Sequence, residues 1–368
     1  KTVRLKVPEA EKFFASWYKN ETNIGIELST PGKVAKQMLK KLGGPDRVRI
    51  LSNEGILRLI QSTVGNGSAT PTLTSKKLMS ELNKIASKSK MWDAKGLLGW
   101  LLHIGALELG AEIQCPHCDK HNWYPLNRLD NTLVCEKCLD EYEVPNDNPQ
   151  QGLVWAYSLV GPFRLPKMAD GAYTTLLALY FLNETMHFSI TPHLSFQKPK
   201  DTDIEADFGL LIHDRSYYGS KVSSALGECK SFKGEFEAKD INRMKNMAKG
   251  LDDPILIFAT LKNKLDKGEK RRLNQLLISQ RKARLKNGNK SRLLILTGNE
   301  LFSDLLGLEK QWEGLTKKHK SLAKHIGGAD IASLCDATQQ LYLSSQSYSD
   351  WFQEVFNPKK ETASVKEV

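Results

Sequence analysis

The chain has 368 residues, of which 40% are hydrophobic and 26% are charged, and these values exclude a disordered or fibrous protein. The hydrophobic stretch Gly96–Leu107 carries no formal charge, but it is too short to cross a bilayer. No secretory signal pattern opens the sequence, so a cytoplasmic protein with reduced cysteines is expected. Because the sequence starts at Lys1 without an initiator Met, we expect it to be part of a longer protein.

Basic residues exceed acidic ones, 53 against 42, which gives a formal net charge of +11. Twelve of the basic residues and two of the acids lie between Lys262 and Arg292. A basic segment of this kind suits a polyanion, and nucleic acid, DNA above all, is the expected partner. The alternative is a solvated helix face that binds nothing.

Residues 1–110 are predicted to be mainly helical. Thr30 and Pro31 begin an amphipathic stretch that ends at two glycines, which is typical of a capped helix. A strand or hairpin over Leu107–Cys115 follows the helices. This order suits a winged-helix-like unit that reads duplex DNA, and it suits a plain helical scaffold equally well. Further helices are predicted over Ser52–Val64, after a Thr74 cap, and over Asp93–Ala106.

Residues 111–150 carry two Cys-x2-Cys pairs, Cys115 with Cys118 and Cys135 with Cys138, separated by sixteen residues. Each pair can place two thiolates on one side of a metal ion, and the chain between them can bring the pairs together. Disulfide pairing does not suit the expected compartment. The segment resembles a zinc ribbon. Because all four ligands are cysteines, a structural Zn²⁺ is expected rather than a catalytic one.

Residues 151–305 are predicted to alternate between helices and strands, and residues 306–368 to form C-terminal helices and a frayed tail. The apolar run Pro254–Leu261 is typical of a strand buried on both faces. The whole order predicts a mixed β-sheet flanked by helices, hence an α/β layered domain. The other elements expected are helices at Ala172–Met186, Glu237–Leu251 and Lys267–Lys286, and strands at Phe188–Gln197, Ala206–Asp214, Ala225–Phe232 and Arg292–Gly298.

Acidic and basic side chains gather in two of these strands. The period of two along a strand places Glu228 and Lys230 on one face and Cys229 on the other, and Asp207 lies in the neighbouring strand. Two carboxylates and a lysine suit metal-assisted phosphodiester hydrolysis. Mg²⁺ prefers oxygen ligands, and the ammonium can stabilise the negative charge of the reacting phosphate. The alternative is a surface salt bridge with no catalytic role.

This arrangement resembles the PD-(D/E)XK nuclease superfamily, which has the restriction-endonuclease-like fold, and the resemblance extends over about Ala172–Gly298. The aspartate of the family motif corresponds to Asp207, and the (D/E)-x-K part corresponds to Glu228 and the two residues after it. The resemblance implies that Asp207, Glu228 and the backbone carbonyl of Cys229 bind Mg²⁺ or Mn²⁺.

The same resemblance assigns roles to further residues. It implies that Lys230 positions or activates the attacking water and that Glu184, in the preceding helix, supports the metal site. Ala206 stands where the family name has proline, which many members also lack. Glu205 and Asp203 share the strand parity of the motif aspartate, so they are alternative metal ligands.

Basic side chains near the motif are expected to contact the phosphates of a nucleic-acid backbone, because such contacts position a protein without reading sequence. A solvated helix face is again the alternative for each of them. They are Lys239, Arg243 and Lys245 in the helix after the motif, and Lys270, Arg271 and Arg272 in the basic segment.

The sequence therefore predicts a metal-dependent endonuclease, and the resemblance implies hydrolysis of DNA to 5′-phosphate and 3′-hydroxyl ends. A zinc ribbon beside such a domain resembles an effector of a prokaryotic restriction or anti-phage defence system. The effector could act by itself, as a homo-oligomer or within a larger complex, and no membrane partner is expected. Three alternatives stay open: a catalytically silent DNA-binding module, an RNA-directed nuclease, and an adaptor that docks a larger complex through its zinc ribbon.

Overall fold

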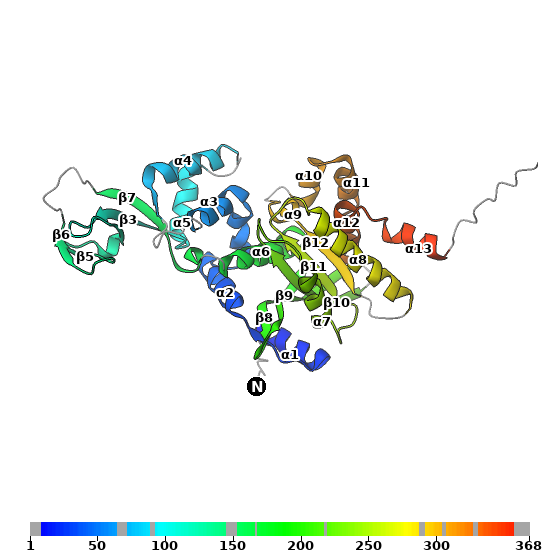
Figure 1. The fold of residues 1–368 in the computed structure, drawn as a ribbon. Helices are drawn as coiled ribbons and strands as arrows, with labels where there is room; N and C mark the ends of the chain where they lie inside the picture. Colours follow the sequence, from blue (N-terminus) through cyan, green and yellow to red (C-terminus); the bar gives the residue numbers. More distant parts are fainter. Residues whose placement is uncertain are drawn as a thin grey trace, which may run out of the picture. The chain divides into compact units, whose positions relative to one another are not determined.

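The computed structural model of the chain describes residues 9–64, 72–88, 93–144, 153–165, 168–216, 219–286, 291–303, 307–326 and 330–356. The chain folds into two compact units (Figure 1). Residues Lys1–Ser29 and Phe181–Val368 form the sheet unit, and Thr30–Tyr180 form the ribbon unit. Among the helices that the structure describes, none combines the length and the apolar character that a membrane crossing requires.

The sheet unit contains a six-stranded mixed sheet, which confirms the predicted α/β class. The pairs β1·β8, β8·β9 and β9·β10 are antiparallel, whereas β10·β11 and β11·β12 are parallel. All six residues of β11 are buried, as its apolar sequence predicts for an interior parallel strand. In sheet order the strands are β1 (Glu27–Leu28), β8 (Ser189–Lys198), β9 (Asp201–Ser216), β10 (Gly219–Lys230), β11 (Ile255–Thr260) and β12 (Arg292–Leu296).

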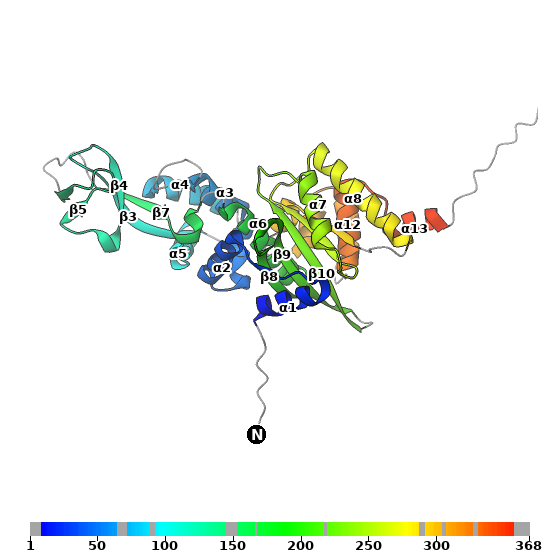
Figure 2. The ribbon, with the colours of Figure 1, turned by 60° about the horizontal axis from the view of Figure 1, so that its bottom comes forward.

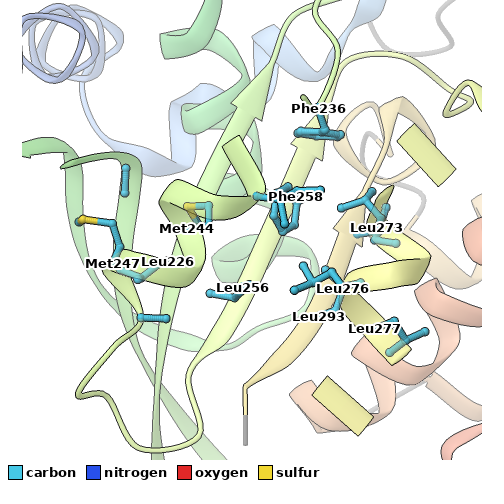
Figure 3. Packing of buried hydrophobic residues seen from close by; sticks show 14 of the residues in the cluster. Leu226, Phe236, Met244, Met247, Leu256, Phe258, Leu273, Leu276, Leu277 and Leu293 are labelled. Carbon is cyan, nitrogen blue, oxygen red and sulfur yellow. The ribbon is translucent and has the colours of Figure 1, made fainter. Parts of the chain in front are cut away.

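Helices α7 (Ala238–Met247) and α8 (Lys267–Leu285) lie against this sheet (Figures 2 and 3). Helix α8 begins at a capping box in which Asp266 accepts the amide of Glu269 at 2.8 Å. Burying one large apolar side chain stabilises a fold by about 1.5–3 kcal/mol, so the shared core holds both helices to the sheet. Figure 3 shows this core, which contains Leu226, Leu256, Phe258 and Leu293 from the strands, Met244 and Met247 from α7, and Leu273, Leu276 and Leu277 from α8.

The other helices of the sheet unit are shorter than α8, and all of them except η4 come from the N-terminal and C-terminal parts of the chain. The tail predicted at the C-terminus lies outside the described residues, which end at residue 356. These helices are α1 (Ala10–Thr22), the short π-helix η4 (Phe181–Thr185), α9 (Gly298–Leu301), α10 (Gly307–Glu313), α11 (Lys317–Ile326), α12 (Ile331–Leu343) and α13 (Tyr348–Phe356).

The ribbon unit contains a sheet with the strand order β2-β7-β3-β4, in which all pairs are antiparallel. Apart from the cysteine-rich segment, three helices and three of these strands come in the order helix, strand, helix, helix, strand, strand. These elements are α3 (Glu54–Val64), β2 (Thr72–Thr74), α4 (Ser75–Ala86), α5 (Ala94–His103), β3 (Leu107–Gln114) and β7 (Val154–Leu159). The unit also contains α2 (Thr30–Leu42), η1 (Pro45–Ser52), η3 (Gly161–Arg164) and α6 (Met168–Tyr180).

The cysteine-rich segment is inserted between β3 and β7. β4 (His121–Pro125) returns along β3, and the 3-10 turn η2 (Leu126–Arg128) follows it. A separate two-stranded sheet then forms from β5 (Thr132–Val134) and β6 (Glu141–Glu143). Each Cys-x2-Cys pair lies at the turn that joins two of these strands.

The two units differ from the four segments 1–110, 111–150, 151–305 and 306–368 that the sequence suggested. β7 pairs with β3 along Leu107–Glu112. Residues 154–159 therefore belong to the ribbon unit and not to the α/β sheet that follows in the sequence. β1 pairs with β8, which joins residues 27–28 to the sheet unit. Both differences arise because strand pairing joins segments that lie far apart in the sequence, and local composition does not record such pairs.

Candidate active site and metal centre

The acidic side chains of the motif meet where β9 and β10 part. The two strands pair antiparallel as far as Gly227 opposite Phe208, so one further step in this register sets Glu228 beside Asp207. Opposed residues of antiparallel strands share a face, and Lys230 lies on the face of Glu228 by the period of two. The structure therefore brings the two carboxylates and the lysine together, at the carboxyl end of β10.

Glu228 is the central residue of this site. Only 2% of it is exposed, and both of its carboxylate oxygens have cationic partners. Lys230 Nζ lies 2.9 Å from Oε1, and Arg243 Nη2 donates to Oε1 and Oε2 at 2.8 and 2.7 Å. An unpaired carboxylate is costly to bury, so these two cations are what allow Glu228 to lie inside the fold.

Helix α7 supplies a further carboxylate, which the sequence reasoning missed. Asp240 is 1% exposed, and its oxygens lie 2.9 Å from Lys230 Nζ and 3.3 Å from Arg243 Nη2. It also accepts the amide of Glu237 at 2.8 Å in the capping box that begins α7. An acid and an arginine three residues apart share a helix face, and this spacing directly after the motif strand is the signal that could have identified the pair.

Asp207 is half-buried beside these groups, and the amide of Cys229 donates to its Oδ2 at 2.6 Å. Burial, and then the like charge of Glu228, raise the pKa of Asp207 well above its usual range, although this hydrogen bond opposes them. Burial also raises the pKa of Glu205, whose charge acts on Asp207 as well. The side chain of Asp203, the other alternative ligand, lies outside the part of the chain that the structure describes.

Lys230 remains cationic at this site. Burial works to lower the pKa of its ammonium, but the carboxylates of Glu228 and Asp240 outweigh burial and raise the pKa. A lysine with a raised pKa is a poor general base at neutral pH. Lys230 can therefore supply a fixed positive charge, but it is not suited to taking a proton from water.

Glu184, assigned a supporting role by the resemblance, lies in η4. It is half-buried and accepts a hydrogen bond from the amide group of Asn183 at 2.6 Å. Among the described residues, its contacts do not include the two motif carboxylates or the motif lysine. The other residue of the motif, Cys229, is buried and stands opposite Ala259 of β11, so its thiol is not part of the acidic cluster.

The six basic residues that were expected to contact phosphates fall into two groups. Arg243 is paired with carboxylates in the acidic site, and Arg272 donates from Nε to the carbonyl of Phe236 at 2.6 Å. Lys239 is exposed and lies 2.9 Å from the carboxylate of Glu237. The exposed residues, which a polyanion can reach, are Lys239, Lys245, Lys270 and Arg271.

The loop between β10 and α7 is held by the first turn of α8. Glu269 is fully buried and accepts the amide of Phe236 at 3.0 Å and the ammonium of Lys262 at 2.7 Å. The ring of Phe236 packs edge-on against Phe258 of β11. Because this loop leads directly into α7, these contacts determine where Asp240 lies relative to the motif.

In the ribbon unit, the four cysteine thiols form one cluster, in which all Sγ atoms lie within 4.8 Å of one another. The Sγ atoms of Cys115 and Cys138 are 3.7 Å apart, and those of Cys118 and Cys135 are 3.6 Å apart. Tetrahedral ligands at metal–sulfur distances of about 2.3 Å are separated by about 3.8 Å, so the cluster has the dimensions of a metal site. A disulfide needs about 2.0 Å, and the four thiols are free.

The two cysteine pairs have the same backbone geometry. The amide of Asp119 donates to the carbonyl of Cys115 at 3.0 Å, and that of Leu139 to Cys135 at 2.9 Å. Asp119 and Leu139 both have positive φ, 56° and 67°. The amide of Cys138 lies 3.5 Å from Sγ of Cys135. Although burial opposes it, such amide hydrogen bonds lower the pKa of Cys135 to about 6. At Cys118 and Cys138 backbone hydrogen bonds act in the same direction, but burial and the neighbouring thiols outweigh them and raise the pKa of both thiols.

No family model, no curated protein and no solved structure matches this chain.

Proposed function

We propose that the sheet unit is a metal-dependent nuclease that hydrolyses phosphodiester bonds in DNA. The observation that carries this proposal is that Asp207 and Glu228 lie close together, one step beyond the last paired residues of β9 and β10, with Lys230 between Glu228 and Asp240 of α7. The site lies at the carboxyl end of β10, which runs parallel to β11, and this end of a strand is where open α/β sheets bind ligands.

The donor set fits a hard divalent cation. Carboxylate oxygens and a backbone carbonyl are the ligands that Mg²⁺ and Mn²⁺ take in proteins. The formal charges of the group leave an excess of two negative charges, which one divalent cation balances. The group consists of the acids Glu205, Asp207, Glu228 and Asp240 and the cations Lys230 and Arg243.

In the proposed mechanism, Asp207, Glu228 and the carbonyl of Cys229 would hold the metal ion. The ion, when bound, polarises the phosphate and activates a water molecule. Lys230, fixed by Glu228 and Asp240, places its ammonium where charge accumulates on the reacting phosphate. Arg243 already contacts both oxygens of Glu228, so metal binding there requires the guanidinium to release one of them.

Substrate binding in this proposal uses the exposed cations around the site. Lys239 and Lys245 on α7, with Lys270 and Arg271 on α8, would contact backbone phosphates, because such contacts need charge but no base recognition. The element order from η4 to β12 supports the resemblance to PD-(D/E)XK nucleases, since three antiparallel strands are followed by helix, parallel strand, helix and parallel strand. A role as effector in restriction or anti-phage defence stays a prediction from that resemblance.

We further propose that the cysteine cluster of the ribbon unit binds a structural Zn²⁺. The Sγ separations of 3.6 and 3.7 Å support a tetrahedral ion, and four thiolates leave no coordination position for water or substrate. The hydrophobic cluster around these cysteines is small, and it includes Tyr124, Leu133 and Tyr142. A metal ion would therefore supply much of the stability of this segment.

The test is a cleavage assay with the full chain on plasmid DNA and on labelled single- and double-stranded oligonucleotides of DNA and RNA. Mg²⁺ or Mn²⁺ is added or omitted, and EDTA is avoided because it would also remove zinc from the ribbon. Lys230→Ala is expected to lower the rate at least about 100-fold, as loss of one charge-stabilising group does. The matched control is Lys320→Ala, an exposed lysine of α11, which should cleave at the rate of the unchanged protein.

Each outcome selects one function. Mg²⁺-dependent DNA cleavage that Lys230→Ala abolishes supports the nuclease, and cleavage of RNA alone supports the RNA-directed alternative. Salt-sensitive DNA binding without cleavage supports a catalytically silent module. Absence of both cleavage and binding contradicts the proposal and leaves the zinc-ribbon adaptor.

A further inference from the structure

A pocket of about 170 Å³ lies in the sheet unit between α8, β12, α12 and the start of α13. Its walls combine three arginines with apolar side chains and an aromatic ring. Arg281 and Arg284 come from α8, Arg292 from β12 and Tyr348 from α13. None of these residues belongs to the acidic site, so the pocket needs a separate account.

Arg281 is the most buried of the three arginines, with 7% of its surface exposed. Its Nη2 donates to Gln339 Oε1 at 3.3 Å and to the carbonyl of Gln346 at 3.1 Å, and the nearest oxygen of Asp336 lies 3.8 Å away. Its Nε is buried, and none of the described residues accepts a hydrogen bond from it. A buried guanidinium with an unused donor is unfavourable, and a hydrogen bond from it to an anionic ligand would relieve this cost.

Arg284 and Arg292 share a single carboxylate. Arg292 Nη2 lies 3.0 Å from Asp253 Oδ2, and Arg284 contacts the other oxygen of Asp253. With the pair of Arg281 and Asp336, the described residues set three guanidinium groups at the pocket against two carboxylates. The planar donors of arginine match the oxygens of phosphate, so the excess charge favours a phosphate group.

The pocket also offers an unused acceptor. The side chain of Gln280 is 6% exposed and donates to Ser291 Oγ at 2.9 Å, but no described residue donates to its Oε1. An anion without a proton to donate, such as sulfate, has no use for this acceptor. A ligand that fills both vacant roles therefore carries an N–H or O–H donor as well as an anionic group.

The remaining surface of the pocket suits a flat ring. Leu277 and Leu293 form its apolar side. Tyr348 also lines the pocket, and this residue is 39% exposed. The guanidinium of Arg284 lies 6.0 Å from the centre of this ring. Aromatic and guanidinium planes are the surfaces on which nucleobases stack.

We propose that this pocket binds a phosphorylated nucleoside. Its phosphate would lie on Arg281, Arg284 and Arg292, its base against Tyr348, and a hydroxyl or amino group on Gln280 Oε1. The proposal does not rest on nuclease activity, because no residue of the acidic site takes part. The same chemistry is presented by a free mononucleotide and by the 5′-phosphorylated end of a strand, and the test separates these sources.

The experiment is calorimetric titration of the full chain, without divalent metal, with AMP, adenosine and inorganic phosphate. A 5′-phosphorylated oligonucleotide and its 5′-hydroxyl counterpart form a second pair of probes. We expect AMP or the phosphorylated strand to bind at least tenfold more tightly than its unphosphorylated counterpart and than inorganic phosphate. Whichever probe binds identifies the source.

Two variants locate the site. Tyr348→Ala is expected to weaken AMP binding about tenfold through loss of stacking, and Arg292→Gln by at least as much. Lys282→Gln, an exposed charge change on the same helix, is the matched control and should bind as the unchanged protein does. Thermal unfolding of each variant confirms that it is folded before it is titrated.

Three results would overturn the proposal. Equal binding of inorganic phosphate and AMP would indicate an adventitious anion only. An equal loss of affinity for AMP in Lys282→Gln and Arg292→Gln would indicate that the ligand is held by general charge attraction. No binding of any phosphorylated probe by the folded chain would exclude the site. None of these results bears on DNA cleavage at Asp207 and Glu228, which the assay with Lys230→Ala tests separately.

Discussion

The backbone amide of Cys229 donates a 2.6 Å hydrogen bond to the carboxylate of Asp207, at the point where the pairing of β9 and β10 ends. This bond holds the aspartate of one strand against the backbone of the next, between Glu228 and Lys230. Because an amide donor favours the ionised carboxylate, it partly offsets the burial and like charge that raise the pKa of Asp207. Asp207 is thus held in place by the same strand that carries the other motif residues.

Asp207→Asn should keep the fold while it abolishes cleavage. Asparagine retains an oxygen that can accept the Cys229 amide, and it removes a charge that lies beside Glu228. We therefore expect urea unfolding without divalent metal to give a stability equal to or above that of the unchanged chain. Asp207→Ala, in contrast, leaves the amide of Cys229 without this acceptor, so its free energy of unfolding should fall by about 1–3 kcal/mol. A large loss of stability in the Asn variant would contradict this account.

Removal of Arg243 should destabilise the sheet unit. Arg243→Ala leaves Glu228 and Asp240, which are 2% and 1% exposed, without one of their two cations. Because the arginine itself is partly solvated, we expect the free energy of unfolding to fall by about 1–3 kcal/mol. This is less than the loss of stability expected when a fully buried ion pair is broken. The control is Arg58→Ala, whose pair with Glu54 lies on the surface of α3 and should contribute less than about 1 kcal/mol. Similar losses in the two variants would show that the acidic site is more hydrated than its burial indicates.

The ribbon unit should contain zinc. We expect about one zinc ion per chain by elemental analysis, and its loss in Cys135→Ser. The matched control is Cys335→Ser, which changes a buried cysteine outside the cluster and should retain the metal. Chelation should remove structure around Tyr124 and Tyr142, which amide hydrogen exchange would detect as faster exchange over residues 111–144. Full protection without zinc would contradict a structural role.

The cap of α8 should make stability depend on pH in the acid range. The amide of Glu269 and the nearby Lys262 lower the pKa of Asp266, so its ionised form stabilises the folded chain. This stabilisation is present above the ordinary pKa of an aspartate, and it is lost as the pH falls through the lowered folded-state pKa. Asp266→Ala should therefore lose about 1 kcal/mol at pH 7.

Denaturant unfolding of Asp266→Ala and of the unchanged chain, at pH 7 and at about pH 3, checks this difference in stability. The difference should be smaller at the lower pH, because the unchanged chain then loses its charged cap. The control is Asp252→Ala, an exposed aspartate in the bend before β11, which should change stability little at either pH. A difference between Asp266→Ala and the unchanged chain that does not depend on pH would rule out an ionised cap.

Local rules in the sequence determined much of the molecule. The period of two along a strand places Glu228 and Lys230 on one face, and the apolar run over residues 255–260 forms a fully buried strand. The Cys-x2-Cys spacing was likewise sufficient to predict that Cys115 and Cys138 lie in one cluster. Each of these predictions depends on the residue types within one short segment of the chain.

Only the tertiary structure decided which groups compensate the charge at the site. From the sequence we expected Arg243 to contact phosphates, but in the structure it pairs with Glu228, because the buried carboxylate of β10 needs a cationic partner and α7 presents Arg243 beside it. The pairing of β7 with β3 and the convergence of Arg281 and Tyr348 on one pocket also depend on chain segments far apart in sequence. Such contacts follow from long-range packing, which residue spacing does not encode.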